Sequence, residues 1–447
     1  MPEARYWCSE TAPLPEVRSH LPFRQCSRQT TLRGITPRRA NQVRGTSAPL
    51  RRSIFAAQPL IDEIPARKTD TGVNPRTGAK MAHGSAAQLT LWRATSGLRR
   101  FQMKVLVLGG TLFLGRAIVD QALANGHEVT LFNRGRTNPD LFNGVENLIG
   151  DRNSDLTQLR GRIFDAVIDT SGYFPRQVQA VIDALEGNIA HYTFVSTTDV
   201  YADHSIPGRN ENAELATVTD LDDEQSGDNY GGFKALSEAT LDAALPGRVH
   251  HVRAGLIVGP HDNSGRFTYW VKRIAAGGEV LAPEPRDQPV QFIDVRDLAQ
   301  WILHAASNQV TGAMNASASP GSMTMESVLN TINAQTGNQA NLTWVGEEFL
   351  MSQGVKPWSQ LPLWLPPASF PTHAGRASRN TSLAIKHGLV VRPLSDTVQA
   401  VREDLENRLQ NAQGGTADGS GGAGLTLLRE SELLSLWREQ AGPDRRV

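Results

Sequence analysis

A glycine-rich turn at residues 109–115 constrains the fold of this 447-residue chain more than any other stretch. Lys104–Leu108, before the turn, is apolar, β-branched and of strand length, and Arg116–Ala124, after it, has apolar residues at helical spacing. Strand, glycine turn and helix form the context of a dinucleotide site, because the backbone must approach a pyrophosphate at a helix N-terminus. The glycines that serve this need are Gly109, Gly110 and Gly115. A strand–helix connection without a ligand is the alternative, so other residues must decide.

Composition and charge exclude several classes of protein. Hydrophobic residues make up 39% of the chain, and 45 basic side chains balance 45 acidic ones, so we expect a globular fold without an overall field for nucleic acid. No apolar run approaches the roughly 18 residues of a membrane helix. Both cysteines, Cys8 and Cys26, precede the turn. We therefore expect no disulfide, cysteine nucleophile or metal site in the globular part, and a cytoplasmic location.

The first hundred residues differ from the rest. Residues 1–102 are rich in Arg, Ser, Thr, Pro and Gly and lack sustained periodicity, so we predict a disordered basic extension. An arm that touches RNA or a membrane, or a transit peptide, is the functional alternative. Because Met103 stands one residue before the first predicted strand, we expect translation to begin there.

Strand-length runs alternate with helical patterns after the turn. Four such runs are His127–Asn133, Asn147–Gly150, Ala166–Thr170 and His191–Ser196. Between the last two, Arg176–Leu185 has Val and Ile at helical spacing. This alternation predicts an α/β fold with a doubly wound parallel sheet.

The end of the second predicted strand bears on the choice of cofactor. An NAD-binding domain places an acid there for the ribose hydroxyls, but this chain has the neutral Asn133. Arg134 and Arg136 follow and can pair with a 2′-phosphate, which favours NADP over NAD. An exposed basic loop without a ligand is the alternative.

Two further stretches fall at the carboxyl edge of the predicted sheet, where open α/β folds bind ligands. Asp151 follows the third strand and would accept a hydrogen bond from the adenine amino group, unless it is an ordinary turn residue. Ser171 and Gly172 follow the fourth strand.

One Tyr–Lys pair indicates acid–base chemistry. Tyr230 and Lys234 are four residues apart at the start of a helical stretch, so they share one helix face. The ammonium group, helped by a cationic nicotinamide, favours the phenolate form of the tyrosine. Such a tyrosine can exchange a proton with an alcohol while hydride leaves the carbon, and the Thr197 hydroxyl can hold the substrate oxygen. A surface helix pair is the alternative.

With these residues in order, the sequence resembles the short-chain dehydrogenase/reductase superfamily, in its extended or atypical branch of NAD-dependent epimerases and dehydratases, from residue 103 to about 410. The matching segments are Gly109–Gly115, Asp151, Thr170–Gly172, Ser196–Tyr201, Tyr230–Lys234, Arg253–Pro260 and Gln291–Asp297. The resemblance implies a Rossmann domain whose cofactor residues are Gly109, Gly110, Thr111, Phe113, Leu114, Gly115, Asp151, Thr170, Ser171 and Gly172. It implies Tyr230 as general acid/base, Lys234 as the ligand of the nicotinamide ribose, and Thr197 as the catalytic hydroxyl.

One residue departs from this family pattern. Leu112 replaces the middle glycine of the turn, and the resulting form resembles an atypical subgroup that includes the chloroplast stem-loop RNA-binding proteins. We expect a side chain there to crowd the pyrophosphate. The complete set of Thr197, Tyr230 and Lys234 implies that the catalytic groups are retained.

The chain divides into five predicted parts. After the extension we predict a NAD(P)-binding Rossmann domain over 103–260, a smaller α/β substrate subdomain with returns to the sheet over 261–410, a flexible linker over 411–424 and an amphipathic helix over 425–447. The helix is expected to dock on the main body or on a second subunit. Its predicted apolar side contains Leu428, Leu433, Leu434 and Trp437.

Several residues of the second half carry a structural and a functional interpretation. Trp270 is expected in a helix core, whereas Arg266 is left open as a ligand for an anionic group. We predict that Trp358–Pro367 packs the second domain rather than walling the pocket, and that Asp297 caps a helix. The acidic stretch Arg209–Asp228 is predicted to be a solvated loop, with a substrate lid as the alternative.

Together these features predict an NAD(P)-dependent oxidoreductase or epimerase that acts on a secondary alcohol or ketone of a small molecule such as a nucleotide sugar, with a homodimer as the expected assembly. A non-catalytic nucleotide-binding protein and an RNA-binding protein are the alternatives. Neutral charge and the intact Tyr–Lys pair oppose the RNA hypothesis.

Overall fold

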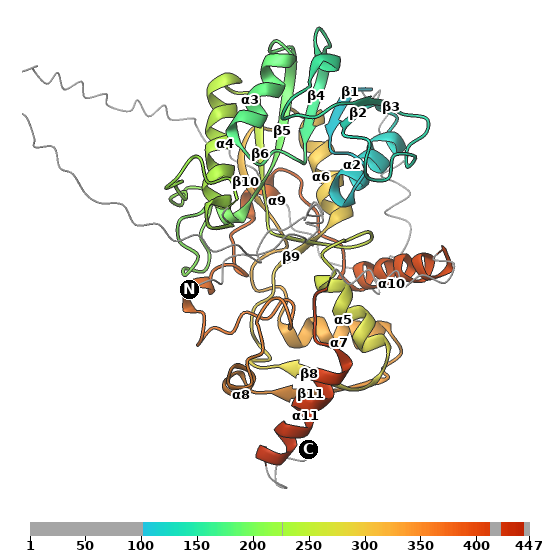
Figure 1. Ribbon diagram of the computed structural model, residues 1–447, viewed down its shortest axis with the longest axis vertical. Helices are drawn as coiled ribbons and strands as arrows, with labels where there is room; N and C mark the ends of the chain where they lie inside the picture. The colour runs from blue at the N-terminus through green and yellow to red at the C-terminus, as the bar shows by residue number, and fades with distance from the viewer. Residues whose placement is uncertain (1–101, 226, 412–421, 442–447) are drawn as a thin grey trace, which may run out of the picture. The chain divides into compact units, whose positions relative to one another are not determined.

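The computed structural model describes residues 102–225, 227–411 and 422–441, which belong to one compact unit (Figure 1). The predicted extension over 1–102 and the predicted linker over 411–424 lie almost entirely outside these ranges. Within them, no helix combines the length and apolar composition that a membrane span requires.

A seven-stranded parallel sheet carries the first half of the unit (Figure 1). The strands are β1 (Lys104–Leu108), β2 (Glu128–Asn133), β3 (Glu146–Ile149), β4 (Phe164–Asp169), β5 (Ile189–Thr197), β6 (Val249–Ala254) and β10 (Gly312–Ala316). Their order is β10-β6-β5-β4-β1-β2-β3, so the winding reverses between β1 and β4, where open α/β sheets bind ligands. The predicted α/β fold with a doubly wound Rossmann sheet is confirmed.

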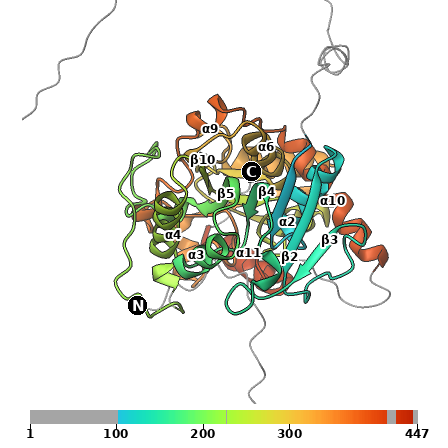
Figure 2. The ribbon, with the colours of Figure 1, turned by 90° about the horizontal axis from the view of Figure 1, so that it is seen from above.

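Helices cover both faces of this sheet. They are α2 (Phe113–Ala124), α3 (Pro175–Ala184), α4 (Tyr230–Ala244) and α6 (Val295–Ser307). Val105 and Val107 of β1 belong to the core beneath α2 and α6, whereas Leu106 and Leu108 belong to the core beneath α3 and α4. Figure 2 shows α3 and α4 on one side of the sheet and α6 on the other. Because successive strand side chains alternate in direction, this continuous apolar strand is buried on both faces.

The N-terminus of α6 differs from its prediction. Asp294 is the N-cap, and its carboxylate accepts the N–H of Arg296 at 2.8 Å. The prediction that Asp297 caps this helix is wrong, because Asp297 lies within the first turn of α6 and accepts hydrogen bonds from the backbone N and the Nε of Arg392 at 2.8 and 2.7 Å. The cap position therefore depends on where β9 (Phe292–Asp294) ends.

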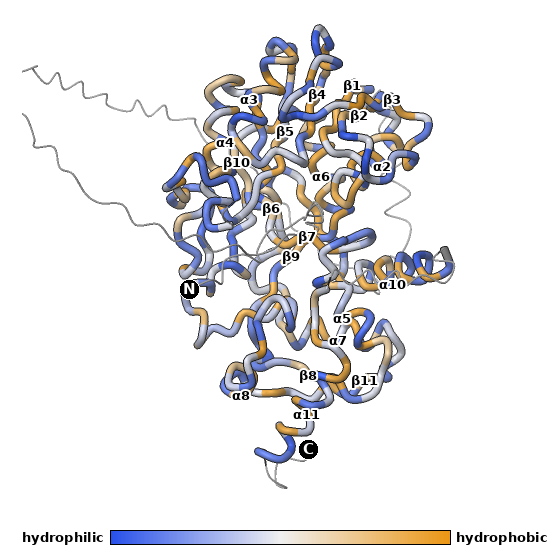
Figure 3. Tube along the Cα trace, in the orientation of Figure 1, coloured by the Kyte–Doolittle hydropathy of each residue, from blue (hydrophilic) through white to orange (hydrophobic). Residues whose placement is uncertain are grey.

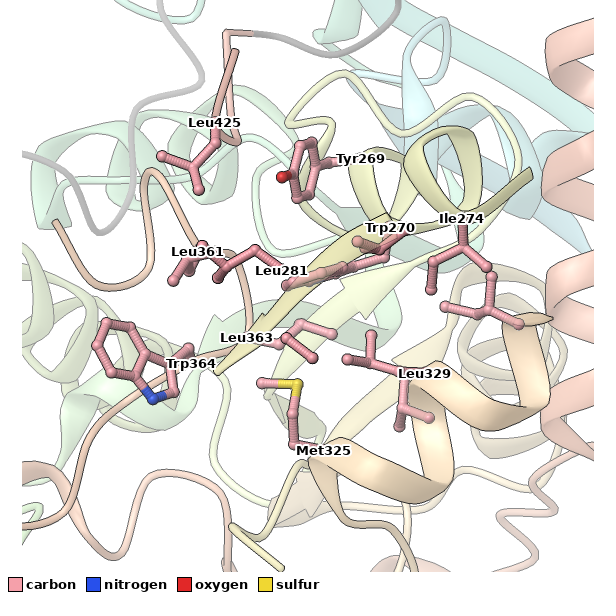
Figure 4. Close-up of a cluster of buried hydrophobic side chains, with 14 of the residues drawn as sticks. Tyr269, Trp270, Ile274, Leu281, Met325, Leu329, Leu361, Leu363, Trp364 and Leu425 are labelled. Carbon is pink, nitrogen blue, oxygen red and sulfur yellow. The ribbon is translucent and has the colours of Figure 1, made fainter. Parts of the chain in front are cut away.

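A second hydrophobic core lies in the later part of the chain (Figure 4). Its elements are α5 (Arg266–Ala275), β8 (Gly278–Pro283), α7 (Met325–Gln335), β11 (Ala340–Val345) and α8 (Glu347–Ser352). Trp270 is fully buried there and donates its indole N–H to Pro362 O at 2.7 Å, which confirms its predicted core position. β7 (Leu256–Val258) pairs in parallel with β9 between the two cores. The predicted boundary at residue 261 stays a prediction.

The last helices pack against this second core. In α11 (Leu427–Ala441), Leu433 and Leu434 are buried and the Trp437 ring lies 5.0 Å from that of Phe349. Leu428 is 83% exposed, so its predicted place on the apolar side is wrong; it lies about 140° around the helix from Leu433. Figure 3 shows hydrophobic and hydrophilic residues alternating along α10 (Leu394–Asn411), a pattern expected of a helix with one buried side. The short helix α9 (Ser382–Lys386) precedes α10.

One buried histidine predicts acid lability. His250 of β6 is fully buried with its ring 4.9 Å from that of Trp301, and neither ring nitrogen has a hydrogen-bond partner among the described residues. Burial lowers the pKa of His250 to about 3. The unfolded chain takes up this proton below about pH 6.5, so stability present above that pH is lost on acidification, by about 2 kcal/mol between pH 6.5 and 5.

The variant His250→Phe should therefore lose less stability between pH 7.5 and 5 than the wild type, as measured by urea unfolding at both pH values. His304→Gln, which removes an exposed imidazole, is the control and should retain the wild-type pH dependence. An equal loss in wild type and His250→Phe would show that other groups cause the acid lability.

Candidate active site

The glycine turn between β1 and α2 forms a close-fitting cradle. Gly109 has a left-handed backbone (φ 92°), and its N–H donates to Phe132 O at 3.1 Å. A side chain at Gly115 would place its Cβ 2.3 Å from Gly109 O, so α2 begins directly against the turn. Leu112 is extended at the N-cap of α2, and its side chain packs against the α2–α6 core. These features fit a pyrophosphate at the helix N-terminus.

The other turn residues are buried or held by neighbouring backbone. A Cβ at Gly110 would lie 2.6 Å from Leu131 Cδ2. Thr111 is buried, and its carbonyl accepts a hydrogen bond from Asn138 Nδ2 at 2.9 Å. The next two residues after Leu112, Phe113 and Leu114, are also buried.

The charges of the basic loop after β2 act on the carboxylate of Asp151. Arg134 and Arg136 are exposed. The pKa of Asp151 is lowered chiefly by a hydrogen bond from the Asn153 backbone N–H at 2.9 Å, with further contributions from the charges of Arg134 and Arg136. Asp151 is therefore an ionised acceptor beside a basic loop.

The Thr170–Gly172 loop packs against the glycine turn. Thr170 Oγ1 donates to Leu108 O at 2.9 Å. A Cβ at Gly109 would lie 2.8 Å from Thr170 Oγ1. Ser171 contributes its backbone N–H to Asp169 Oδ1 at 3.0 Å. The loop after β4 and the loop after β1 thus form one continuous edge.

Lys234 is buried at the carboxyl ends of β4 and β5. Its ammonium donates to Gly172 O at 2.6 Å and to Val195 O at 2.7 Å, and it lies 4.0 Å from the centroid of the Phe194 ring. The predicted catalytic lysine is therefore fixed by the same loop that lines the predicted cofactor site.

Tyr230 and Thr197 come from neighbouring elements. Tyr230 opens α4, one helical turn before Lys234, and its ring lies 6.3 Å from that of Tyr173. Thr197 ends β5, and its Oγ1 accepts the N–H of Asp199 at 3.1 Å. Strand end and helix start thus present both hydroxyls at the same edge of the sheet.

One cavity of about 620 Å³ brings the predicted catalytic residues together. Thr197, Tyr230 and Lys234 all line it. From the predicted cofactor set, its wall includes Phe113, Leu114 and Thr170. The remaining predicted cofactor residues do not line it: Gly109, Gly110, Thr111, Gly115, Arg134, Asp151, Ser171 and Gly172. They lie along the sheet edge, in the turn and in the loops already described.

Much of the remaining cavity wall comes from later parts of the chain. The Arg266 guanidinium lies 5.4 Å from the centroid of the Trp358 ring, and both residues line the cavity. Arg376 forms an ion pair with Asp199, which comes two residues after Thr197, and both residues line the cavity. Asp262, also in this wall, is buried, and its burial raises its pKa. The wall therefore mixes cations, a carboxyl group and an aromatic ring.

This arrangement corrects the prediction for Trp358–Pro367. Trp364 packs in the second core as expected, but Trp358, Leu363 and Leu365 line the cavity. The segment therefore both packs the core and walls the cavity.

Residues 105–317 match the sequence model of the NAD dependent epimerase/dehydratase family. This part of the chain is similar in sequence to that family. The match contains the glycine turn, the Thr170–Gly172 loop and the predicted catalytic residues of the cavity. A chloroplast stem-loop binding protein of 41 kDa from Arabidopsis thaliana is 26% identical over 225 residues, which cover 46% of this chain and 56% of that protein. The chain thus spans little more than half the length of this relative.

Solved structures share the fold of this chain over about two thirds of its length. A putative epimerase from Burkholderia cenocepacia is 17% identical and superimposes with a TM-score of 0.52 over 67% of this chain and 97% of its own. A UDP-glucose 4-epimerase with UDP-glucose from Thermotoga maritima is 15% identical, with a TM-score of 0.51 over 69% and 100%. A UDP-glucose 4-epimerase from Bifidobacterium longum in complex with NAD⁺ and UDP is 17% identical, with a TM-score of 0.50 over 69% and 99%.

Part of the cavity wall lies beyond the matched epimerase/dehydratase segment. Trp358, Arg376 and Ala423 line the cavity but follow residue 317. Sequence reasoning missed Asp199, Asp262 and Arg376. No fixed spacing links these residues, so periodicity gave no signal for them.

Two further side chains contact partners outside the cavity. His261 Nδ1 lies 2.8 Å from Asp404 Oδ1, and no group of three or more potential metal ligands occurs within the part of the chain that the structure describes. Glu224 of the predicted acidic loop forms an ion pair with Arg176 at 2.6 Å. The solvated loop, with a substrate lid as the alternative, stays a prediction for this stretch.

Proposed function

We propose that this chain is an NAD(P)-dependent epimerase or oxidoreductase that acts on a secondary alcohol or ketone of a nucleotide sugar. The observation that carries the proposal is the shared cavity of Thr197, Tyr230 and Lys234, beside the glycine turn of an epimerase/dehydratase domain. The substrate class is suggested by the UDP-glucose 4-epimerases with the same fold.

Each proposed catalytic residue has a distinct task. When bound, the dinucleotide supplies the nicotinamide ring that takes up or returns hydride. The Tyr230 hydroxyl exchanges the proton of the substrate oxygen, and Thr197 Oγ1 holds that oxygen in place. The Lys234 ammonium, one helical turn from Tyr230, stabilises the phenolate electrostatically. Its bonds to two carbonyl groups fix the position of this charge.

The remaining cavity residues offer groups for the rest of the substrate. We propose that Arg266 and Arg376 attract the anionic part of a nucleotide sugar. The Trp358 ring holds the guanidinium of Arg266 in place. Tyr173 and Leu363 complete the wall with apolar surface. Such a site orients a polar ligand between the catalytic edge and the second core.

A nucleic-acid-binding function is the second candidate, because the Arabidopsis relative is called a stem-loop binding protein. Equal numbers of basic and acidic residues weaken it, since nucleic-acid affinity depends on neutralising phosphates. The two candidates predict different ligands.

Calorimetric titration of the full chain with NAD⁺, NADP⁺ and a stem-loop RNA distinguishes the enzyme hypothesis from the nucleic-acid-binding hypothesis. We expect dinucleotide binding and weak, strongly salt-dependent RNA binding. The dinucleotide-loaded protein is then given a panel of UDP-sugars, and conversion is followed by chromatography. RNA binding without dinucleotide binding would contradict the enzyme hypothesis.

The same titration tests the proposed preference for NADP. Arg134→Ala should weaken NADP⁺ binding about 10-fold and leave NAD⁺ binding nearly unchanged, because only NADP⁺ carries the 2′-phosphate. Arg162→Ala removes a partly exposed arginine that is paired with Glu146 and serves as control. Unchanged NADP⁺ affinity in Arg134→Ala would refute the preference.

A further inference from the structure

A buried ion pair connects two loops that sequence reasoning treated separately. Arg152 follows Asp151 after β3, and Asp169 ends β4. In the sheet, β2 and β1 lie between those strands. Arg152 nevertheless reaches Asp169 with two parallel hydrogen bonds, Nη1 to Oδ1 and Nη2 to Oδ2, both of 2.8 Å. The pair therefore spans the sheet edge from the proposed adenine side to the proposed nicotinamide side.

The environment of the pair is closed, and each carboxylate oxygen of Asp169 accepts two hydrogen bonds. The Asp169 side chain is fully buried, and that of Arg152 is 10% exposed. Asp169 Oδ2 also accepts the hydroxyl of Tyr192 at 2.8 Å, and Oδ1 accepts the N–H of Ser171 at 3.0 Å. Burial acts to raise the pKa of Asp169, but the charge and hydrogen bonds of Arg152 lower it overall. Both groups thus stay charged away from water.

The pair also holds the loop that meets the catalytic lysine. Arg152 Nη1 donates to Ser171 Oγ at 3.1 Å. A Cβ at Gly172 would lie 2.8 Å from Asp169 Oδ2, so the loop passes directly over the carboxylate. The carbonyl of that same glycine accepts the 2.6 Å hydrogen bond of Lys234. Displacement of the Asp169 carboxylate would therefore move both Ser171 and the Gly172 carbonyl that binds Lys234.

We propose that Arg152 and Asp169 are positioning residues that hold the Ser171–Gly172 segment, and through it Lys234, in register with the glycine turn. The inference rests on the proposed function, because it assigns the pair a task in dinucleotide binding. Its effect falls on the nicotinamide half of the ligand, since the held loop lies at the end of β4. On the adenine side, Asp151 Oδ1 accepts hydrogen bonds from the backbone N–H and the Nδ2 of Asn153, neither of which uses the Arg152 guanidinium.

The test compares NADH with 5′-AMP, which carries only the adenine half. Removal of one partner leaves a buried charge, so the variant of choice is Arg152→Met combined with Asp169→Asn, which removes both charges. Arg152→Lys, which keeps the charge but loses the paired geometry, is measured in parallel. We expect NADH affinity to fall about 10-fold or more in both variants while 5′-AMP affinity changes less than about threefold.

Thermal unfolding of the same samples identifies a general loss of structure. Arg162→Met, which breaks the partly exposed ion pair with Glu146, is the control and should retain the affinity for both ligands. The inference is overturned if folded variants bind NADH within twofold of wild type, or if NADH and 5′-AMP weaken by the same factor. Wild-type protein that binds neither ligand would overturn the proposed function and this inference together, whereas unaffected variants of a binding wild type overturn the inference alone.

Discussion

Tyr230→Phe is expected to lower kcat by about 10³-fold while NAD⁺ affinity stays within about twofold of wild type. The substitution removes only the hydroxyl that exchanges the substrate proton. The ring can keep its contact with Tyr173 at the start of α4. Turnover is measured with the UDP-sugar that the wild type converts, and affinity by calorimetry.

The control for this variant is Tyr269→Phe. Tyr269 is buried in the second core and does not line the cavity, so loss of its hydroxyl should leave kcat near the wild-type value. If Tyr230→Phe turns over at the wild-type rate, another group transfers the proton and the assignment of Tyr230 fails. A loss of NAD⁺ binding in Tyr230→Phe would instead indicate a role in forming the site.

Gly115→Ala should abolish dinucleotide binding and lower stability. The added Cβ would lie 2.3 Å from Gly109 O and 3.0 Å from Gly110 Cα, and both contacts are with backbone that cannot rotate away. Either α2 or the turn must shift, which costs about 1–3 kcal/mol of unfolding free energy. Because the pyrophosphate would bind at this junction, we expect NAD⁺ affinity to fall about 100-fold or more.

Gly144→Ala provides the matched control, because a Cβ there meets no heavy atom within 4 Å and its backbone φ is not positive. Both variants are compared by urea unfolding and by NAD⁺ titration. Wild-type affinity in Gly115→Ala would mean that the turn does not approach a dinucleotide.

Local sequence patterns predicted the elements of the main sheet well. The apolar runs, the glycines and the helical spacing each reflect interactions within about ten residues, so the positions of β1, α2 and α4 follow from the chain itself. The pair Tyr230 and Lys234 belongs to this class, because a spacing of four fixes a shared helix face. The error at Asp297 concerned a helix end, where the neighbouring carboxylate of Asp294 took the cap position.

Contacts between distant segments had no such signal. Asp199 and Arg376 are 177 residues apart in the ion pair of the cavity wall. Trp358 carries no periodicity that separates it from the buried Trp364. Such residues are brought together only when the second core packs against the sheet. This packing depends on many weak apolar contacts and not on a short sequence motif.

The sequence by itself determined the strand–turn–helix unit, the parallel sheet and the residue types at its carboxyl edge, because each depends on local sterics and side-chain periodicity. Only the tertiary structure decided which of those residues share a cavity, which later segments close it, and that Arg152 reaches across the sheet edge to Asp169. The reason is that a buried charge needs a partner in space, and the position of that partner is set by the packing of the whole fold.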